Sequence, residues 1–200
     1  MSSTAQATAL HALADEPPVD RDAAMTAVAD LLAALGYEPD AGDLAETPRR
    51  VADALIEMLT PEPFEMTTFP NDDGYDEPVV VGGIPFVSLC RHHLLPFRGT
   101  ATVGYLPAAR LVGLSKLARV VAHHARGLQV QEAMTVQIAR TLEDALAPRG
   151  VGVVVEAEHL CMSVRGVRAA GAGTSTTVFR GEFAHDAALR ARITAASPIG

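Results

Sequence analysis

The sequence contains no tryptophan, few aromatic residues and only two cysteines, and each scarcity excludes a class of protein. Aromatic residues make up 4% of the 200 residues and the net charge is −8, whereas nucleic-acid surfaces are usually basic and carry stacking aromatics. Two cysteines cannot staple a secreted scaffold, and the N-terminus shows no basic region followed by an apolar core. We therefore expect a protein of the reducing cytoplasm, with no nucleic-acid partner and no disulfide.

Long apolar runs are missing as well. No segment approaches the roughly 18 consecutive apolar residues that a membrane span needs, so no membrane partner is expected. The chain is 48% hydrophobic and 20% charged, with a mean hydropathy of +0.18, a composition that argues against disorder. A chain of this length can bury about two-thirds of its unfolded surface. The sequence therefore predicts a soluble globular protein with its own core.

Acidic residues are absent from Pro78 to Gln131, whereas Met1 to Glu77 holds 17 acids and only three arginines. The acid-free stretch carries six cations, among them the only lysine, Lys116. This asymmetry favours a pocket for a small anion. A buried stretch that lacks charges of either sign is the alternative, but burial would have removed the arginines too.

Helices and strands are predicted in blocks. Residues 1–19 form a mobile tail, 20–60 an N-terminal helical region with helices over 20–35 and 47–59, 61–77 a Pro- and Asp-rich connector, and 78–200 the main domain. In the main domain, strands are predicted over 79–89, 100–106, 151–158, 161–167 and 174–182, and helices over 115–127, 130–147 and near the C-terminus. Because the two types do not alternate strictly, the fold class is α+β with a largely antiparallel sheet.

Cys90 and His93 form a C-x-x-H pair inside the segment SLCRHHLLPF. Two soft ligands three positions apart, joined by a tight turn, can present a thiolate and an imidazole to one zinc ion. By itself the signal is weak. A buried cysteine beside two ordinary histidines, His92 and His93, fits the same letters.

The only other cysteine lies in the segment EHLCMSVR. If this segment is a strand, alternation places His159, Cys161, Ser163 and Arg165 on one face. Cys90, His93 and Cys161 would then give three protein ligands, and three ligands plus water are typical of a catalytic zinc. A fourth ligand from His92 or His159 would make the site structural, and a disulfide between the two thiols is the remaining alternative.

A third group begins at Ser115, at the predicted start of a helix. Lys116 and Arg119 lie one turn apart, so backbone donors, the positive helix end and two cations could meet a phosphate. A helix with two solvated charges is the simpler interpretation. Glu132, the first acid after the acid-free stretch, could partner a donor-rich ligand or be an ordinary carboxylate in a helix's first turns.

Taken in order, these motifs resemble the GTP cyclohydrolase I family. The resemblance covers about residues 21–195 and rests on SLCxHHLLPF, GLSKLAR, LQVQE and EHLCMSVRGV. It implies a tunnelling fold for residues 78–200, in which four-stranded antiparallel sheets join into a ring, and a homodecamer of two face-to-face pentamers with sites between subunits. It also implies conversion of GTP and water into formate and 7,8-dihydroneopterin triphosphate, the first step towards tetrahydrofolate or other pterins.

The resemblance also implies a role for each site residue. Cys90, His93 and Cys161 hold Zn²⁺, which activates water for attack on carbon 8 of guanine. His159 protonates nitrogen 7, while His92 positions water and assists proton transfers. Ser115 relays protons while the ribose rearranges. The expected substrate contacts are Glu132 and Gln131 to guanine, and Lys116, Arg119, Arg165 and Arg50 to the triphosphate.

Some positions depart from the family pattern. Arg91 stands where glutamate is usual, which reverses a charge beside the metal ligands. Asp53 takes the place of a phosphate-binding lysine in some relatives, and Gly127 and Ala133 replace common arginines. Two alternatives therefore stay open: a sibling tunnelling-fold enzyme acting on a pterin, and a catalytically silent nucleotide-binding subunit.

Overall fold

The computed structural model describes residues 6–10 and 18–197, and the chain divides into two compact units. One unit comprises residues 13–60 and the other residues 1–12 and 61–200. Among the described residues, no helix is long and apolar enough to cross a membrane.

The smaller unit consists of α1 (Arg21–Ala34), a short 3-10 helix η1 (Gly42–Leu44) and α2 (Thr47–Leu59). Asp20 caps α1 by accepting a hydrogen bond from the amide of Ala23. The two helices contact each other, and a bidentate ion pair joins Arg21 to Asp53. Among the described residues of this unit only Ala52 is buried, so the helices have apolar side chains but almost no core.

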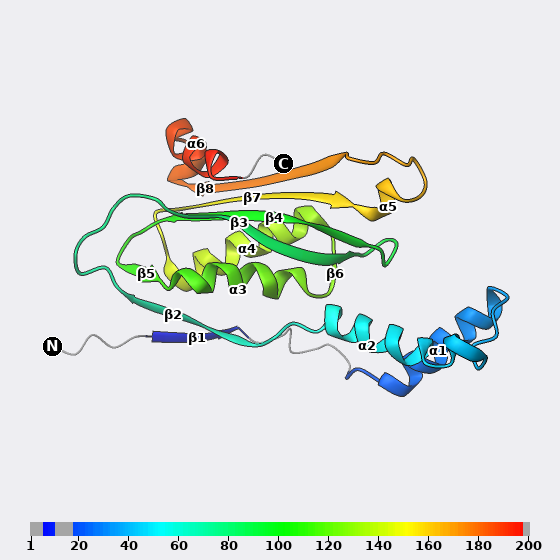
Figure 1. Ribbon diagram of the computed structural model, residues 1–200. Helices are drawn as coiled ribbons and strands as arrows, with labels where there is room; N and C mark the ends of the chain where they lie inside the picture. The colour runs from blue at the N-terminus through cyan, green and yellow to red at the C-terminus, as the bar shows by residue number, and fades with distance from the viewer. Residues whose placement is uncertain (1–5, 11–17, 198–200) are drawn as a thin grey trace. The chain divides into compact units, whose positions relative to one another are not determined.

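The larger unit is built on a five-stranded sheet in the order β6-β3-β4-β7-β8 (Figure 1). Its strands are β3 (Val79–Cys90), β4 (Pro96–Leu106), β6 (Leu128–Gln129), β7 (Gly150–His159) and β8 (Gly173–Gly181). All pairs are antiparallel except β3 with β6. The predicted α+β class with a largely antiparallel sheet is therefore confirmed. The four long strands match the predicted ones, whereas the two-residue strand β6 adds a fifth to the sheet.

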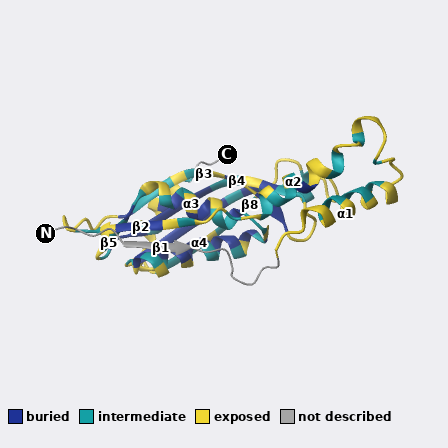
Figure 2. Cartoon of the chain, turned by 90° about the horizontal axis from the view of Figure 1, so that it is seen from below, coloured by how far each residue is buried: buried dark blue, intermediate teal, exposed yellow. Residues whose placement is uncertain are grey.

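Helices cover both faces of this sheet. The helices α3 (Leu114–Ala125) and α4 (Gln131–Leu146) pack on one face, and α6 (Ala187–Ala195), after the 3-10 helix η2 (Glu182–Ala184), packs on the other (Figure 1). Successive side chains of β7 point to opposite faces of the sheet, because side chains alternate along a strand. Val153 and Val155 join the main core with α3 and α4, while Val154 contacts the core that holds Ile193 of α6. Burial on both faces explains why the first part of β7 is continuously apolar. Buried residues, dark blue in Figure 2, are frequent in the larger unit, whereas α1 is teal and yellow.

A second sheet, in the order β1-β2-β5, contains segments that the sequence analysis did not assign to strands. It comprises β1 (Gln6–Leu10), β2 (Phe64–Pro70) and β5 (Arg110–Val112). Strand β2 lies in the predicted connector and β1 in the predicted tail. Met66 and Val112 of this sheet are buried in the main core, so β2 and β5 cover the side of α3 and α4 that faces away from the larger sheet.

Candidate functional site

The C-x-x-H segment forms a tight turn where β3 passes into β4. The amides of His93 and Leu94 both donate to the carbonyl of Cys90, at 3.3 and 2.9 Å, and the Cys90 amide donates to Leu95. Leu94 adopts a left-handed conformation with φ of 55°, which is unusual for a residue with a side chain. The turn places the side chains of both Cys90 and His93 at the end of β3.

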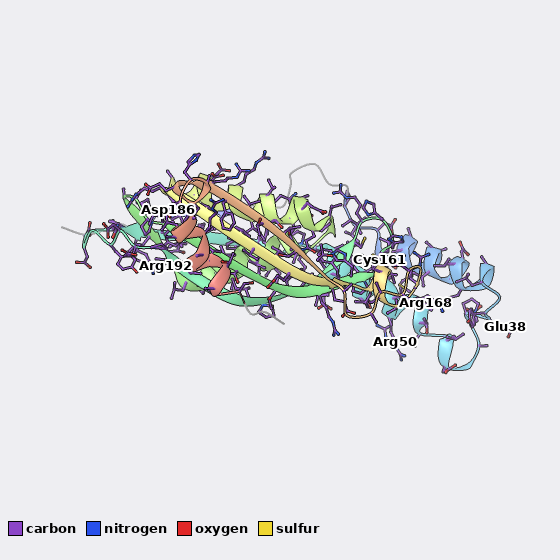
Figure 3. The ribbon with its side chains drawn as sticks, turned by 90° about the horizontal axis from the view of Figure 1, so that it is seen from above. Glu38, Arg50, Cys161, Arg168, Asp186 and Arg192 are labelled. Atoms are coloured by element: carbon purple, nitrogen blue, oxygen red, sulfur yellow. The ribbon has the colours of Figure 1, made fainter. Side chains whose placement is uncertain are left out.

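The register between β4 and β7 brings the segment that contains Cys161 to the same end of the sheet. Phe97, near the start of β4, is paired with His159, the last residue of β7. The chain then enters a short helix, α5 (Leu160–Ser163), which carries Cys161. The ligand atoms of Cys90, His93 and Cys161 lie within 4.8 Å of one another, so these three residues could hold a metal ion. Figure 3 shows Cys161 at the end of the sheet opposite Asp186 and Arg192.

The backbone conformation around Cys161 corrects the prediction of a strand over residues 161–167. Residues 160–163 are helical, and the following turns include Gly166 and Arg168 with positive φ. His159, Cys161, Ser163 and Arg165 therefore do not share one face of a strand. Cys161 reaches the ligand group from the first turn of α5, which contacts β4 and β7.

The electrostatics of the group follow from its partial burial. Burial raises the pKa of the Cys161 thiol, the nearby Cys90 thiol raises it further, and the positive charge of Arg165 opposes the rise. Both cysteines are free thiols. Two thiols and an imidazole at this spacing are the donors that zinc prefers, so the residues fit a zinc ion.

His92 and His159 flank the ligand group. His92 is exposed, and its Nδ1 lies 3.9 Å from Cys90 Sγ, the same distance as Nδ1 of His93. The His159 ring stacks on Phe97, with ring centroids 4.6 Å apart and planes 2° apart. Burial lowers the pKa of His159, while the Glu132 carboxylate opposes this shift. Sequence reasoning missed Phe97, because nothing in the letters LLPF signals a ring that stacks on a histidine.

Gln131 and Glu132 begin α4 beside His159, yet their environments differ. Glu132 is exposed, as a substrate contact requires. Gln131 is only 1% exposed, and its amide bonds to protein groups, including His159 at 2.8 Å. The support of guanine binding by Gln131 stays a prediction, while in the folded chain its amide is bonded to protein groups.

The predicted phosphate-binding residues, which begin at Ser115, lie away from the ligand group within one chain. From the ligand end, β4 runs for 11 residues, about 35 Å, before β5 leads into α3. Ser115 lies in the first turn of α3 at that distant end, where Gly113 and not Ser115 is the N-cap (Figure 1). Ser115 and Arg119 are exposed and Lys116 is half-buried. The structure thus does not bring these residues to Cys90, His93 and Cys161 of the same chain.

Arg119 borders a cavity of about 250 Å³ between the start of β2 and α3. The wall also contains His123, Arg126 and one acid, Glu62. Two arginines against one acid give the cavity wall a small excess of positive charge. Arg165, by contrast, lies just beyond α5 at the ligand end, and Arg50 is exposed on α2 in the smaller unit.

Two of the positions that depart from the family pattern have clear environments. Arg91 is exposed, its amide donates to the carbonyl of Gln129, and its side chain donates through Nε to the carbonyl of Leu128 at 3.3 Å. Asp53 is paired with Arg21 and Arg49 inside the smaller unit. The Arg91 side chain thus binds β6 and does not join the ligand group.

Fold and site together define an α+β protein with a three-residue group suited to a metal ion and histidines beside it. Residues 24–197 match the family described as GTP cyclohydrolase I, and the chain belongs to that family. It is 50% identical over 181 residues to GTP cyclohydrolase 1 of Mycobacteroides abscessus, covering 87% of this chain and 88% of that protein. It is 51% identical over 177 residues to GTP cyclohydrolase 1 of Streptomyces griseus, covering 86% and 88%. The predicted GTP cyclohydrolase function is therefore confirmed.

Among solved structures, the apo form of the archaeosine synthase QueF-Like aligns with a TM-score of 0.41 and 16% identity. The alignment covers 52% of this chain and 92% of that one.

Proposed function

We propose that this chain hydrolyses and rearranges GTP to formate and 7,8-dihydroneopterin triphosphate with a Zn²⁺ held by Cys90, His93 and Cys161. The observation that carries the proposal is the convergence of these three donors, from two distant segments, beside two further histidines. When bound, zinc would act as a Lewis acid and lower the pKa of a water molecule for hydrolysis. Three protein ligands leave a position open, which is typical of catalytic sites.

The residues around the group would supply proton transfer and substrate binding. His159, held flat against Phe97, is placed to protonate nitrogen 7 of guanine, because imidazole exchanges protons near neutral pH. Exposed His92 would position water and assist later proton transfers. Glu132, exposed at the start of α4, would accept hydrogen bonds from the N–H groups of guanine. Arg165, just beyond α5, would bind the triphosphate from the ligand end.

We further propose that the complete site forms between copies of the chain. The helix α3, which carries Ser115 and the cations, starts at the end of the sheet away from the ligand group. Ser115 would act there as a proton relay. A second copy could supply these residues, with Lys116 and Arg119 binding the triphosphate and Arg50 adding a further charge. Strand β8 lies at one edge of the sheet, and β6 covers only Leu89 and Cys90 at the other edge. Pairing of such edges between copies would generate the ring of a tunnelling fold and a decamer of two pentamers.

The test is incubation of the purified zinc-loaded protein with GTP, followed by formate assay and mass analysis of the product. A His159→Ala variant sharpens it. We expect the wild type to release formate, and the variant to retain zinc and GTP but lose about two to four orders of magnitude in turnover, the usual contribution of a positioned acid or base.

Other outcomes would replace the proposal. GTP binding without formate release in the wild type would define a nucleotide-binding subunit, and turnover of a pterin instead of GTP would define a sibling enzyme. Loss of zinc from His159→Ala in proportion to the loss of activity would make His159 a fourth ligand of a structural site.

A further inference from the structure

The amide of Gln131 is the most completely bonded polar group near the candidate site. Its Nε2 donates to the carbonyls of Val155 and Thr174, both at 3.0 Å, and to the hydroxyl of Thr176 at 3.2 Å. Its Oε1 lies 2.8 Å from Nε2 of His159. Thr135 bonds both to the Gln131 carbonyl and to the Thr176 hydroxyl, at 2.8 and 2.7 Å. The side chain therefore belongs to a network that links α4, β7 and β8.

This network fixes which end of the amide faces His159. Two of the neighbours are backbone carbonyls, which only accept hydrogen bonds, so the NH₂ end must point towards them. A flipped amide would set its oxygen against two carbonyl oxygens in a buried position. The amide oxygen consequently faces His159, and because that oxygen only accepts, the hydrogen of the imidazole is on Nε2.

Phe97 fixes the remaining freedom of the ring. The Phe97 and His159 rings stack with planes only 2° apart, so the imidazole cannot tilt out of the plane without losing this contact. Gln131 sets the rotation within that plane by its bond to Nε2. Among the described residues, no hydrogen bond of His159 Nδ1 is found.

We infer that Gln131 is a positioning residue for His159, holding the ring and its Nε2–H tautomer so that Nδ1 is the nitrogen that faces the substrate. The inference rests on the proposed function for the identity of the substrate, but the tautomer itself does not depend on it. Gln131 acts through His159 and does not touch the substrate. This role accounts for a glutamine buried in the first turn of α4, where an apolar residue would pack without needing hydrogen bonds.

The test compares Gln131→Met with Gln129→Met. Gln129 is a matched control because it is also buried and its Nε2 also donates to a backbone carbonyl, that of His124, and to Gln137, away from His159. For Gln131→Met we expect kcat to fall about 10- to 100-fold, the usual loss when the partner of a functional histidine is removed, with KM and bound zinc nearly unchanged. Gln129→Met should retain the kcat of the wild type, and equal kcat losses in the two variants would overturn the inference.

A spectroscopic measurement tests the tautomer directly. In ¹⁵N-histidine-labelled holoenzyme, magic-angle-spinning NMR should show His159 protonated on Nε2, with the signal assigned by its absence from His159→Ala. The Nε2–H tautomer should lose its dominance in Gln131→Met and persist in Gln129→Met. An Nδ1–H tautomer in the wild type, or the same tautomer in both variants, would refute the positioning role. A wild type that releases no formate would refute the proposed function, while the NMR result would still decide this one.

Should Gln131→Met fail to fold, Thr176→Val provides a milder change. It removes one of three acceptors of the Gln131 amide and leaves the bond to His159 possible. The expected result is a kcat reduced about two- to tenfold, equivalent to one weakened hydrogen bond, with unchanged zinc. An unchanged kcat in Thr176→Val together with an unchanged His159 tautomer would count against the network.

Discussion

The two parts of the candidate site differ in whether the folding of a single chain brings their residues together. At the ligand end, sheet register and one turn of helix bring Cys90, His93 and Cys161 together without any partner. Ser115 and Lys116 lie at the start of α3, whose opposite end leads into β6 beside Cys90. Within one chain the three donors that could hold a metal ion are already together, whereas the proposed complete substrate site needs the cations of a second copy.

The largest expected effect is at the ligand end. Cys90→Ser and Cys161→Ser should each abolish bound zinc and turnover while leaving a folded oligomer, because the core lies among α3, α4 and the sheet and does not need the metal. Metal analysis, formate assay and size measurement check the three parts. Full activity after either change would remove the metal from the mechanism.

A smaller effect is expected from the cations of α3. The double variant Lys116→Ala, Arg119→Ala should keep its zinc and raise KM for GTP about 100- to 10,000-fold, since each of the two charged hydrogen bonds contributes roughly 1.5–3 kcal/mol. Co-assembly of this variant with Cys161→Ser should restore activity at low GTP, because some sites then combine an intact ligand end with intact cations.

The control for co-assembly is a mixture of Cys90→Ser with Cys161→Ser. Both defects lie at the ligand end, so no site can become complete and no activity should return. Recovery in this control, or no recovery in the mixture with the α3 variant, would contradict a site shared between copies.

The smallest effect is expected at Arg91. Arg91→Glu restores the charge usual in the family, and because the arginine side chain is exposed and bonded to the Leu128 carbonyl, zinc should be retained. Turnover should be unchanged or raised. Measurement of bound zinc decides the point, since loss of metal on this change would place Arg91 in direct support of the ligands.

Sequence patterns predicted most of the larger unit because its elements obey simple periodicities. The apolar run from Val79 corresponds to β3, and the four-residue spacing of Met134, Ile138 and Leu142 corresponds to the buried face of α4 in the main core. Strand β2 was missed because its alternation, with only Met66 and Thr68 buried, is short and flanked by prolines and acids. In the smaller unit, Leu31 of α1 and its C-cap Leu35 are apolar at helical spacing, yet both are exposed within one chain. Periodicity indicates which face is apolar but not what covers it.

The residues of the ligand group could be predicted from the sequence, but the backbone conformation that brings Cys161 to the group could not. Cys90 and His93 follow from spacing, and Cys161 was named from an alternation that suits a strand, although the segment is helical. Eight letters are too few to separate the two periods when turns with positive φ follow at Gly166 and Arg168. The role of Gln131 could not be predicted, because it depends on carbonyls of β7 and β8 brought near only by folding.

The separation of the ligands along the chain also sets an order of events during synthesis. Cys161 follows Cys90 by about 70 residues, so a ribosome adding roughly 5–20 residues per second delivers it several seconds later. Until then the nascent chain offers the metal only the thiol and imidazole of one turn, and β7 has not yet paired with β4 to carry the third donor into place. Capture of the proposed metal by all three donors can therefore occur only after Cys161 has been synthesised.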